Sequence, residues 1–297
     1  MSTTEPGTRS GGPQQAERPT HSALPEPADA LRRTPIPLFT KVFTDSWRSL
    51  IGWGAGLAAA IFLYLPLFPS MTGDAGMQDL INNLPPELTR TLNYEQIGTG
   101  AGYTQATVFG LIGFVLMTIA TTSWGSAALG GDEESGRLEL TLAHGVTRVQ
   151  VAVQRFAAML VKILLLAALV FTLVWLLNDS AQLQLNAGYL LGTTLLFAGL
   201  SLLIGSVALL GGALTGRRLG GVAAGASVAV IGYVFNALGN QSSDLEWLHA
   251  LSPYSWAYSN DPLSAGPNTG TIVLFFGASL VLAAVTALVL RRRDIGV

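Results

Sequence analysis

The side chains that most often carry out catalysis are scarce in this chain. Its 297 residues contain no Cys and only three His, and His21, His144 and His249 fall in a tail and two loops. The lack of Cys excludes disulfides, thiolate metal sites and cysteine nucleophiles. There is neither a G-x-x-x-x-G-K-[ST] phosphate loop nor an H-E-x-x-H zinc motif. We predict no catalytic residue, no metal site and no cofactor bound by this chain.

One pair of residues allows an enzymatic alternative. Ser227 stands in a Gly-x-Ser sequence within an apolar stretch, and His249 follows it. A serine nucleophile beside a histidine base is the arrangement of intramembrane serine proteases. However, His249 falls in a predicted loop, and a lone Gly-x-Ser is common in Gly-rich helices. An intramembrane protease therefore stays an alternative, as does a passive channel.

The most highly charged internal stretch covers residues 130–148, between two long apolar runs. Asp132 is placed to cap a short helix, Glu133 and Glu134 would lie at its positive N-terminal end, and Gly145 suits its closing residue. Leu138 and Leu142 lie one turn apart, on one face of that helix. The pattern predicts an apolar ridge with a charged rim. Two interpretations stay open: a docking element, or a loop whose leucines rest on the bilayer.

The composition shows which elements must position this segment. Half of the residues are hydrophobic, only 11% are charged, and the mean hydropathy is +0.47; soluble domains carry about 25% charged residues. The net charge of -2 gives no support for nucleic-acid binding. A membrane-spanning helix needs about 20 mostly apolar residues. Six stretches qualify: Leu50–Phe68, Ala106–Leu129, Phe156–Leu177, Ala187–Leu214, Leu219–Leu238 and Thr271–Leu290.

The sequence before the first span divides into two parts. Residues 1–33 are polar and rich in Pro and Gly, so we expect a disordered cytoplasmic tail. Residues 34–48 have apolar residues at helical spacing with charges between them, which predicts an interfacial amphipathic helix. The alternative is an early extension of the first span. The predicted fold is an all-α polytopic membrane protein, with one transmembrane domain over residues 34–297.

Charge asymmetry predicts how the spans are oriented. Basic residues concentrate before the first span, after the second, after the fourth and after the sixth, whereas the other loops carry acids and a single base, Arg90. Because basic residues accumulate on the cytoplasmic side, both termini are expected to be cytoplasmic. Lys162 lies within the third span, where a snorkelling side chain is favoured over a substrate contact.

The spans contain no Asp or Glu. Transporters that are coupled to ions usually need carboxylates within the membrane. If this chain moves a solute uphill, its energy therefore enters elsewhere.

Three motifs resemble those of permease subunits of ABC-2 type ABC exporters. The first is an acidic pair followed by x-Gly-x-Leu-Glu, a leucine-rich turn and a terminal Arg, here Glu133–Glu134, Gly136, Leu138–Glu139 and Arg148. The second is the Pro-aromatic segment Leu251–Ala257, and the third is the basic C-terminal ending. Gly145 departs from the pattern, because the family usually has Pro at this position.

The resemblance implies a division of labour between subunits. Two permease subunits, identical or not, would pair in the plasma membrane, and each would dock its charged loop on a cytoplasmic ATPase that holds ATP and Mg²⁺. The residues expected at the ATPase contact are Glu133, Glu134, Gly136, Leu138 and Leu142, with Arg148 fixing the exit of the loop.

A path between paired subunits without buried charge favours an apolar or amphiphilic substrate, such as a drug, an antibiotic or a lipid. A transporter for a polar polymer and an assembly factor that depends on partners are the alternatives. The expected polar contacts are hydroxyls within two spans: Thr118, Thr121, Thr122, Thr193 and Thr194.

Overall fold

The computed structural model describes residues 1–3, 37–73, 98–143 and 146–293. The chain divides into two units, Met1–Pro35 and Ile36–Val297, and the described helices all lie in the second. The tail predicted for residues 1–33 lies outside the described residues, apart from its first three. Helices alone make up the regular structure of the described residues, as the sequence predicts.

Six helices are long and apolar enough to cross a membrane, which confirms the predicted number of spans. The candidate spans are Ser46–Ser70, Gly100–Glu134, Arg148–Leu177, Ala187–Thr215, Arg218–Gly239 and Thr269–Arg292. The longest helices within them are α1 (Pro37–Tyr64), α6 (Gly113–Ser126), α9 (Arg148–Leu177), α10 (Ala187–Thr215), α11 (Arg218–Gly239) and α14 (Thr269–Arg292).

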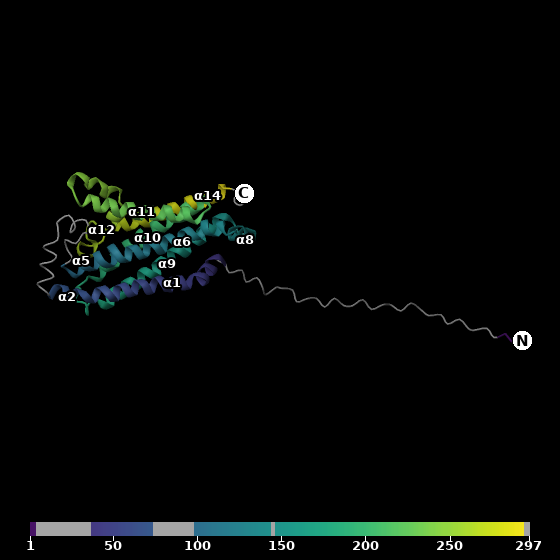
Figure 1. Ribbon diagram of the computed structural model, residues 1–297, viewed down its shortest axis with the longest axis horizontal. Coiled ribbons are helices and arrows are strands. Elements are labelled where there is room, and N and C mark those ends of the chain that lie inside the picture. Colours follow the sequence, from purple (N-terminus) through teal and green to yellow (C-terminus); the bar gives the residue numbers. More distant parts are fainter. Residues whose placement is uncertain (4–36, 74–97, 144–145, 294–297) are drawn as a thin grey trace. The chain divides into compact units, whose positions relative to one another are not determined.

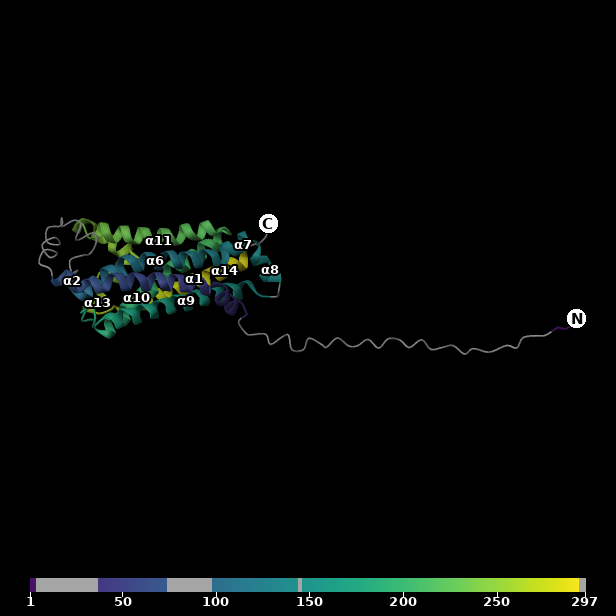
Figure 2. The ribbon, with the colours of Figure 1, turned by 60° about the horizontal axis from the view of Figure 1, so that its bottom comes forward.

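These helices run side by side, so the bundle has two ends (Figures 1 and 2). One end, here the α8 end, holds α7 (Asp132–Glu134), α8 (Arg137–Ala143) and the end of α14. The other, the α12 end, holds α2 (Phe68–Gly73), η5 (Ser243–Leu251), α12 (Pro253–Tyr258) and α13 (Pro262–Ala265). Short helices thus cover both ends of the long ones.

Helix α1 shows that the interfacial segment is not a separate element. The helix begins at Pro37 and continues without a break to Tyr64, where the short helix η1 (Leu65–Leu67) follows. The alternative from the sequence, an extension of the first span, therefore describes the backbone better. The side chains of residues 37–45 lie outside the described part of the chain.

Helix α10 is the centre of the bundle, with 83% of its most apolar window buried. Small residues allow neighbouring helices to approach it closely. A Cβ on Gly199 would lie 2.8 Å from the Cβ of Phe275 in α14, and a Cβ on Gly205 would lie 2.8 Å from the sulfur of Met159 in α9. Bulky residues at these glycines would therefore separate α10 from α14 and α9.

Lys162 of α9 is buried in the bundle, so its predicted snorkelling is wrong. Its Nζ lies 3.4 Å from Ser46 Oγ and 4.5 Å from the ring centroid of Trp124. Trp124 Nε1 in turn donates to Ser49 Oγ at 3.0 Å. The ammonium group thus joins α9 to α1 and α6 instead of reaching solvent.

The Pro-aromatic segment packs α12 against the second and fifth spans. Tyr254 Oη donates to the Gly110 carbonyl at 2.8 Å, and Ser252 Oγ donates to the Gly232 carbonyl at 2.6 Å. The ring of Tyr254 also makes edge contacts with Phe114 and other aromatic rings. These two buried hydroxyls therefore each have a backbone partner, as buried polar groups require.

Candidate functional site

The charged segment predicted from the sequence lies at the α8 end. Three consecutive acids, Asp132, Glu133 and Glu134, make up the whole of α7. We call them the acidic triad. Each one bonds to a basic residue that belongs to, or immediately follows, a different membrane span.

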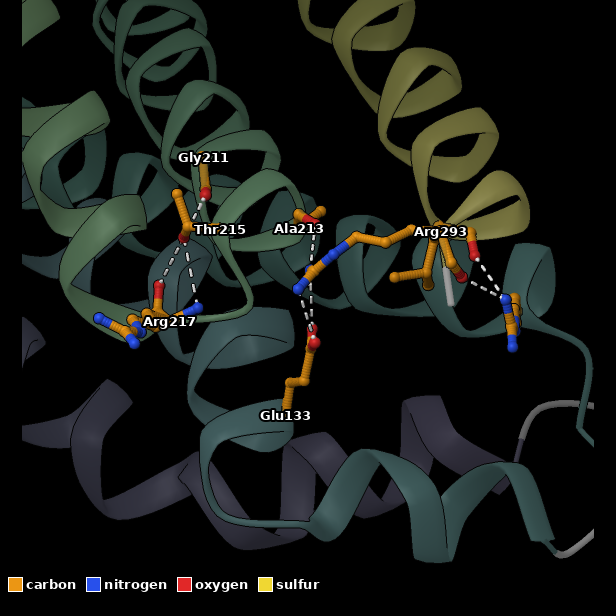
Figure 3. Close-up of polar contacts among 8 residues, drawn as sticks. Glu133, Gly211, Ala213, Thr215, Arg217 and Arg293 are labelled. Atoms are coloured by element: carbon orange, nitrogen blue, oxygen red, sulfur yellow. Dashed lines mark hydrogen bonds and ion pairs between the residues drawn. The ribbon is translucent and has the colours of Figure 1, made fainter. Parts of the chain in front are cut away.

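Glu133 forms a two-pronged ion pair with Arg293, which directly follows α14. Arg293 Nη2 lies 3.0 Å from Glu133 Oε1, and Nη1 donates to Oε2 at 3.1 Å. The same Nη1 donates to the Ala213 carbonyl of α10 at 2.8 Å (Figure 3). Bidentate guanidinium–carboxylate pairs are among the stronger and more directional polar contacts. Glu133 thus links α7 to the ends of α14 and α10.

Asp132 is buried and bonds to two arginines. Arg155, near the start of α9, donates from Nη2 to Asp132 Oδ2, and Arg137 Nε lies 3.5 Å from Oδ1. The prediction that Asp132 caps the helix is wrong, since Gly131 is the N-cap residue and no side chain bonds there. A buried carboxylate needs a cation or several hydrogen bonds, and Arg155 supplies the cation.

Glu134 forms a hydrogen bond to the first turn of α11. Its Oε2 accepts a hydrogen bond from the Arg218 amide at 3.1 Å. Arg217, the N-cap residue of α11, makes no side-chain capping bond. Glu134 therefore satisfies one of the free amides of the first turn and places a negative charge near the positive end of the helix.

The turn between α10 and α11 fits closely against the triad (Figure 3). Gly216 has φ +68°, and a Cβ there would lie 2.6 Å from Glu133 Oε1. Thr215 Oγ1 closes the turn, since it donates to the Gly211 carbonyl at 2.8 Å and accepts from the Arg217 amide at 3.3 Å. A larger residue than glycine at position 216 would displace Glu133.

Gly136 divides the segment into two helices where the sequence predicted one. Its φ of +70° is left-handed, and its amide donates to the Glu133 carbonyl at 2.9 Å. The chain therefore turns after α7 and restarts as α8, since a non-Gly residue is disfavoured in this conformation. Gly145, predicted to close the helix, lies outside the described residues.

Leu138 and Leu142 of α8 face the bundle, whereas the sequence predicted that they face outward, toward the ATPase. Leu138 is 1% exposed and belongs to the hydrophobic core, and Leu142 is partly buried against that core. Leu140, in contrast, is 65% exposed beside exposed Glu139. Leu138 and Leu142 thus hold α8 to the bundle, and Leu140 supplies the apolar part of its outer surface.

Arg148 begins α9 and bonds to the end of α14. Its Nη1 donates to the Arg293 carbonyl at 2.5 Å and lies 3.4 Å from the Leu290 carbonyl. Basic side chains commonly satisfy the free carbonyls at helix C-termini. Arg148 therefore joins the exit of the charged segment to the last span.

The five predicted threonines differ in what their hydroxyls bond to. Thr193 and Thr194 donate to carbonyls one turn earlier in α10, and Thr121 Oγ1 lies 3.4 Å from the Thr118 carbonyl. The hydroxyls of Thr118 and Thr122 are buried and have no hydrogen-bond partner in the described part of the chain. Thr122 faces Gly225 of α11, whose Cβ would lie 2.9 Å from its Oγ1.

The structure does not bring Ser227 and His249 together. Ser227 Oγ donates to the Ala223 carbonyl of its own helix at 2.7 Å. The ring of His249 lies against Gly239, where a Cβ would be 2.5 Å from its Nε2. Gly239 lies twelve positions after Ser227 in α11, which is about 18 Å along a helix. The two side chains therefore cannot form a catalytic pair in this arrangement.

Within the described residues, no group of three or more His, Asp or Glu could hold a metal ion. Residues 39–291 match the family model of the C-terminal domain of the multidrug efflux system permease Rv1217c. A comparison with curated proteins found no match.

Proposed function

The chain belongs to the multidrug efflux permease family, whose model spans most of its length, and we propose from this that it is the membrane subunit of an ATP-driven ABC exporter. A separate ATPase subunit binds ATP and Mg²⁺, and a second permease subunit completes the path. The substrate is an apolar or amphiphilic molecule. The observation that carries the proposal is the acidic triad, which joins one short helix to the ends of the third, fifth and sixth spans.

The distribution of charge supports an orientation with the α8 end in the cytoplasm. Basic residues cluster at that end: Arg137, Arg148, Arg155, Arg217, Arg218, Arg291, Arg292 and Arg293. The connections described at the α12 end carry acids instead: Asp179, Asp244, Glu246 and Asp261. Basic residues favour the cytoplasmic side of a membrane. Both termini are then cytoplasmic, in the plasma membrane.

In this proposal the ATPase binds the charged segment 130–148 through the outer face of α8. Leu140 and Glu139 form the contact, and Glu133, Glu134, Gly136, Leu138, Leu142 and Arg148 hold the segment in place. A displacement of α8 moves α7, since only the Gly136 turn separates them. The ion pairs of Asp132 and Glu133 then carry that displacement to α9 and α14, and the bond to Glu134 carries it to α11.

Reconstitution tests the proposal. The detergent-purified chain, with the ATPase that co-elutes from its own cells, is placed in liposomes with an amphiphilic fluorescent dye. We expect dye accumulation that requires both hydrolysable ATP and the ATPase. The matched control is the permease without its partner, which should accumulate no dye. Uphill accumulation without nucleotide, or equal leakage in both preparations, would contradict an exporter and favour an ion-coupled carrier or a channel.

The unpartnered hydroxyls of Thr118 and Thr122 give a prediction about substrate. Each Thr→Val replacement removes a hydroxyl that is free to bond to a substrate when α6 and α11 separate. We expect a loss of about fivefold in apparent affinity for substrates with a hydrogen-bond acceptor, since such a bond contributes about 1 kcal/mol.

Concentration-dependent transport measures this effect, and Thr193→Val is the matched control. The Thr193 hydroxyl already donates to the Tyr189 carbonyl, so its loss should change the apparent affinity less than about twofold. Equal effects of all three replacements would show that Thr118 and Thr122 do not contact substrate.

A further inference from the structure

The second span departs from regular α geometry at two places. Its backbone is a π-helix over η3 (Gln105–Ile112) and again over η4 (Ala127–Gly131). Between these segments lies the regular helix α6. π-Helical segments are rare, usually occupy a single turn, and often mark functional places in a helix. The two π-helical segments thus bound α6 as a regular helical segment within its span.

Contacts from the α12 end hold η3 in the π register. Tyr254 Oη donates to the Gly110 carbonyl at 2.8 Å. Gln105 Nε2 donates to Asp261 Oδ1 at 3.0 Å, and its Oε1 accepts from the Leu263 amide at 3.1 Å. The π-helical segment thus has polar partners outside its own span, at both of its ends.

Gly113 makes the π register sterically possible where η3 meets α6. A Cβ at this position would collide with the Val108 carbonyl, five residues earlier, and would lie 3.4 Å from the ring of Phe197. Any side chain at 113 would therefore oppose this π turn. The neighbouring Gly110 is also enclosed, with its Cβ position 2.9 Å from Tyr254 Oη.

A small apolar cavity lies beside η3. Its volume is about 10 Å³, and it is partly open to the outside of the bundle. It lies between α1, at Leu57 and Ile61, and the second span, at Val108 and Gly113.

The second π-helix leads directly into the acidic triad. Gly131 ends η4, and Asp132 begins α7. A Cβ on Gly130 would lie 2.6 Å from the Arg217 carbonyl, so η4 packs tightly against the α10–α11 turn. A displacement of the triad can therefore reach α6 along the backbone of η4, and also through Arg218, whose Nη2 donates to Ser123 Oγ at 3.4 Å.

We propose that α6 changes register between its two π-helices and so couples the triad to the α12 end. When a π turn becomes an α turn, the helix beyond it moves by about 1.5 Å and rotates by about 100° for each residue absorbed. The rotation turns Thr118 and Thr122 relative to α11. The driving force for this register change comes from the ATPase and so rests on the proposed function. The register change itself involves residues of this chain alone.

Spin labels report the register directly, because the native chain has no Cys to interfere. Leu111, Val115 and Ile119 are exposed at helical spacing. Cysteines introduced one at a time from 114 to 120 in the purified chain should give maximal oxygen accessibility at 115 and 119. In the Gly113→Ala variant, which opposes the π turn, the maxima should move by about 100°, to the adjacent residues of the helix.

Two comparisons make the test decisive. Gly277→Ala is the matched control, since a Cβ there meets nothing within 4 Å, and it should leave the maxima unchanged. Tyr254→Phe removes the bond to Gly110 but keeps the ring, and it should produce the same direction of shift as Gly113→Ala. If Gly113→Ala and Tyr254→Phe both keep the maxima of the native chain, the register device is wrong.

The same variants separate the device from the proposed exporter activity. In the complex with its ATPase, the native chain should move its maxima when a non-hydrolysable ATP analogue binds, and Gly113→Ala should already be shifted and transport at least tenfold more slowly. A shift in the isolated variant without any ATPase dependence would support the device and contradict the exporter. Active transport with fixed maxima in every variant would overturn the device alone.

Discussion

Leu140→Asp is expected to abolish ATP-driven export while the bundle stays folded and inserted. Leu140 is exposed on the outer face of α8, so in the isolated permease the new carboxylate remains in water at little cost. In the complex it would enter a contact that buries a leucine. Losing that burial costs about 1.5–3 kcal/mol, and desolvating the carboxylate adds to it. Binding of the ATPase should weaken at least about a hundredfold.

Dye accumulation and co-elution of the ATPase measure this effect in one preparation. Leu138→Asp is the informative comparison, because Leu138 is buried and its replacement puts a charge into the core. That variant should lose expression and monodispersity, whereas Leu140→Asp should keep both. Export at the native rate by Leu140→Asp would rule out α8 as the ATPase contact.

Asp132→Ala is expected to give the largest loss of stability among the triad variants. The carboxylate pairs with Arg155, whose side chain is only 19% exposed. Removing one partner of a mostly buried pair leaves the other charge uncompensated and typically costs about 3–5 kcal/mol. We expect a lower unfolding temperature in detergent and loss of the link between α7 and α9.

Arg137→Ala is the matched control for Asp132. Arg137 also pairs with Asp132, but its side chain is 70% exposed, and exposed pairs contribute about 0–1 kcal/mol. A second variant, Asp132→Ala with Arg155→Leu, should recover much of the lost stability, since it removes both charges. If Asp132→Ala unfolds at the same temperature as Arg137→Ala, the pair with Arg155 does not stabilise the segment.

The spans could be predicted because their signal is local. A run of about 20 apolar residues is readable without knowing its neighbours. The structure extends the predicted spans by a few residues, for example from Leu50 back to Ser46 and from Phe156 back to Arg148. These extensions contain charged residues, such as Arg48, Arg148 and Arg155, which weaken the hydrophobic signal at the ends of the spans.

The charged segment shows where such local reasoning fails. Its location and its acids can be predicted, but their partners, Arg155, Arg218 and Arg293, are between 23 and 160 residues away in sequence. The basic residues were recognised only as a topology signal, which says nothing of pairing. Leu138 and Leu140 are only two positions apart in a leucine-rich turn, so helical spacing alone does not show which face is buried.

The interior hydroxyls and the π-helices could not be predicted for a related reason. Thr122 and Thr193 are the same residue type in similarly apolar helices. The Thr193 hydroxyl has a partner one turn earlier in its helix, whereas the Thr122 hydroxyl has none in the described part of the chain. The residues of η3 are as apolar as those of a regular helix. The contacts of Tyr254 and Gln105 distinguish it, and both depend on the tertiary arrangement.

The burial of α10 constrains how the protein is made. This helix is the fourth span to leave the ribosome, yet one of its glycine-lined sides packs on Phe275 of α14, the last span. Until translation is nearly complete, that side faces lipid, or a chaperone in the insertion machinery. A chain truncated before α14 would therefore hold five inserted helices around an unfinished centre, which is a form that membrane quality-control proteases can recognise and degrade.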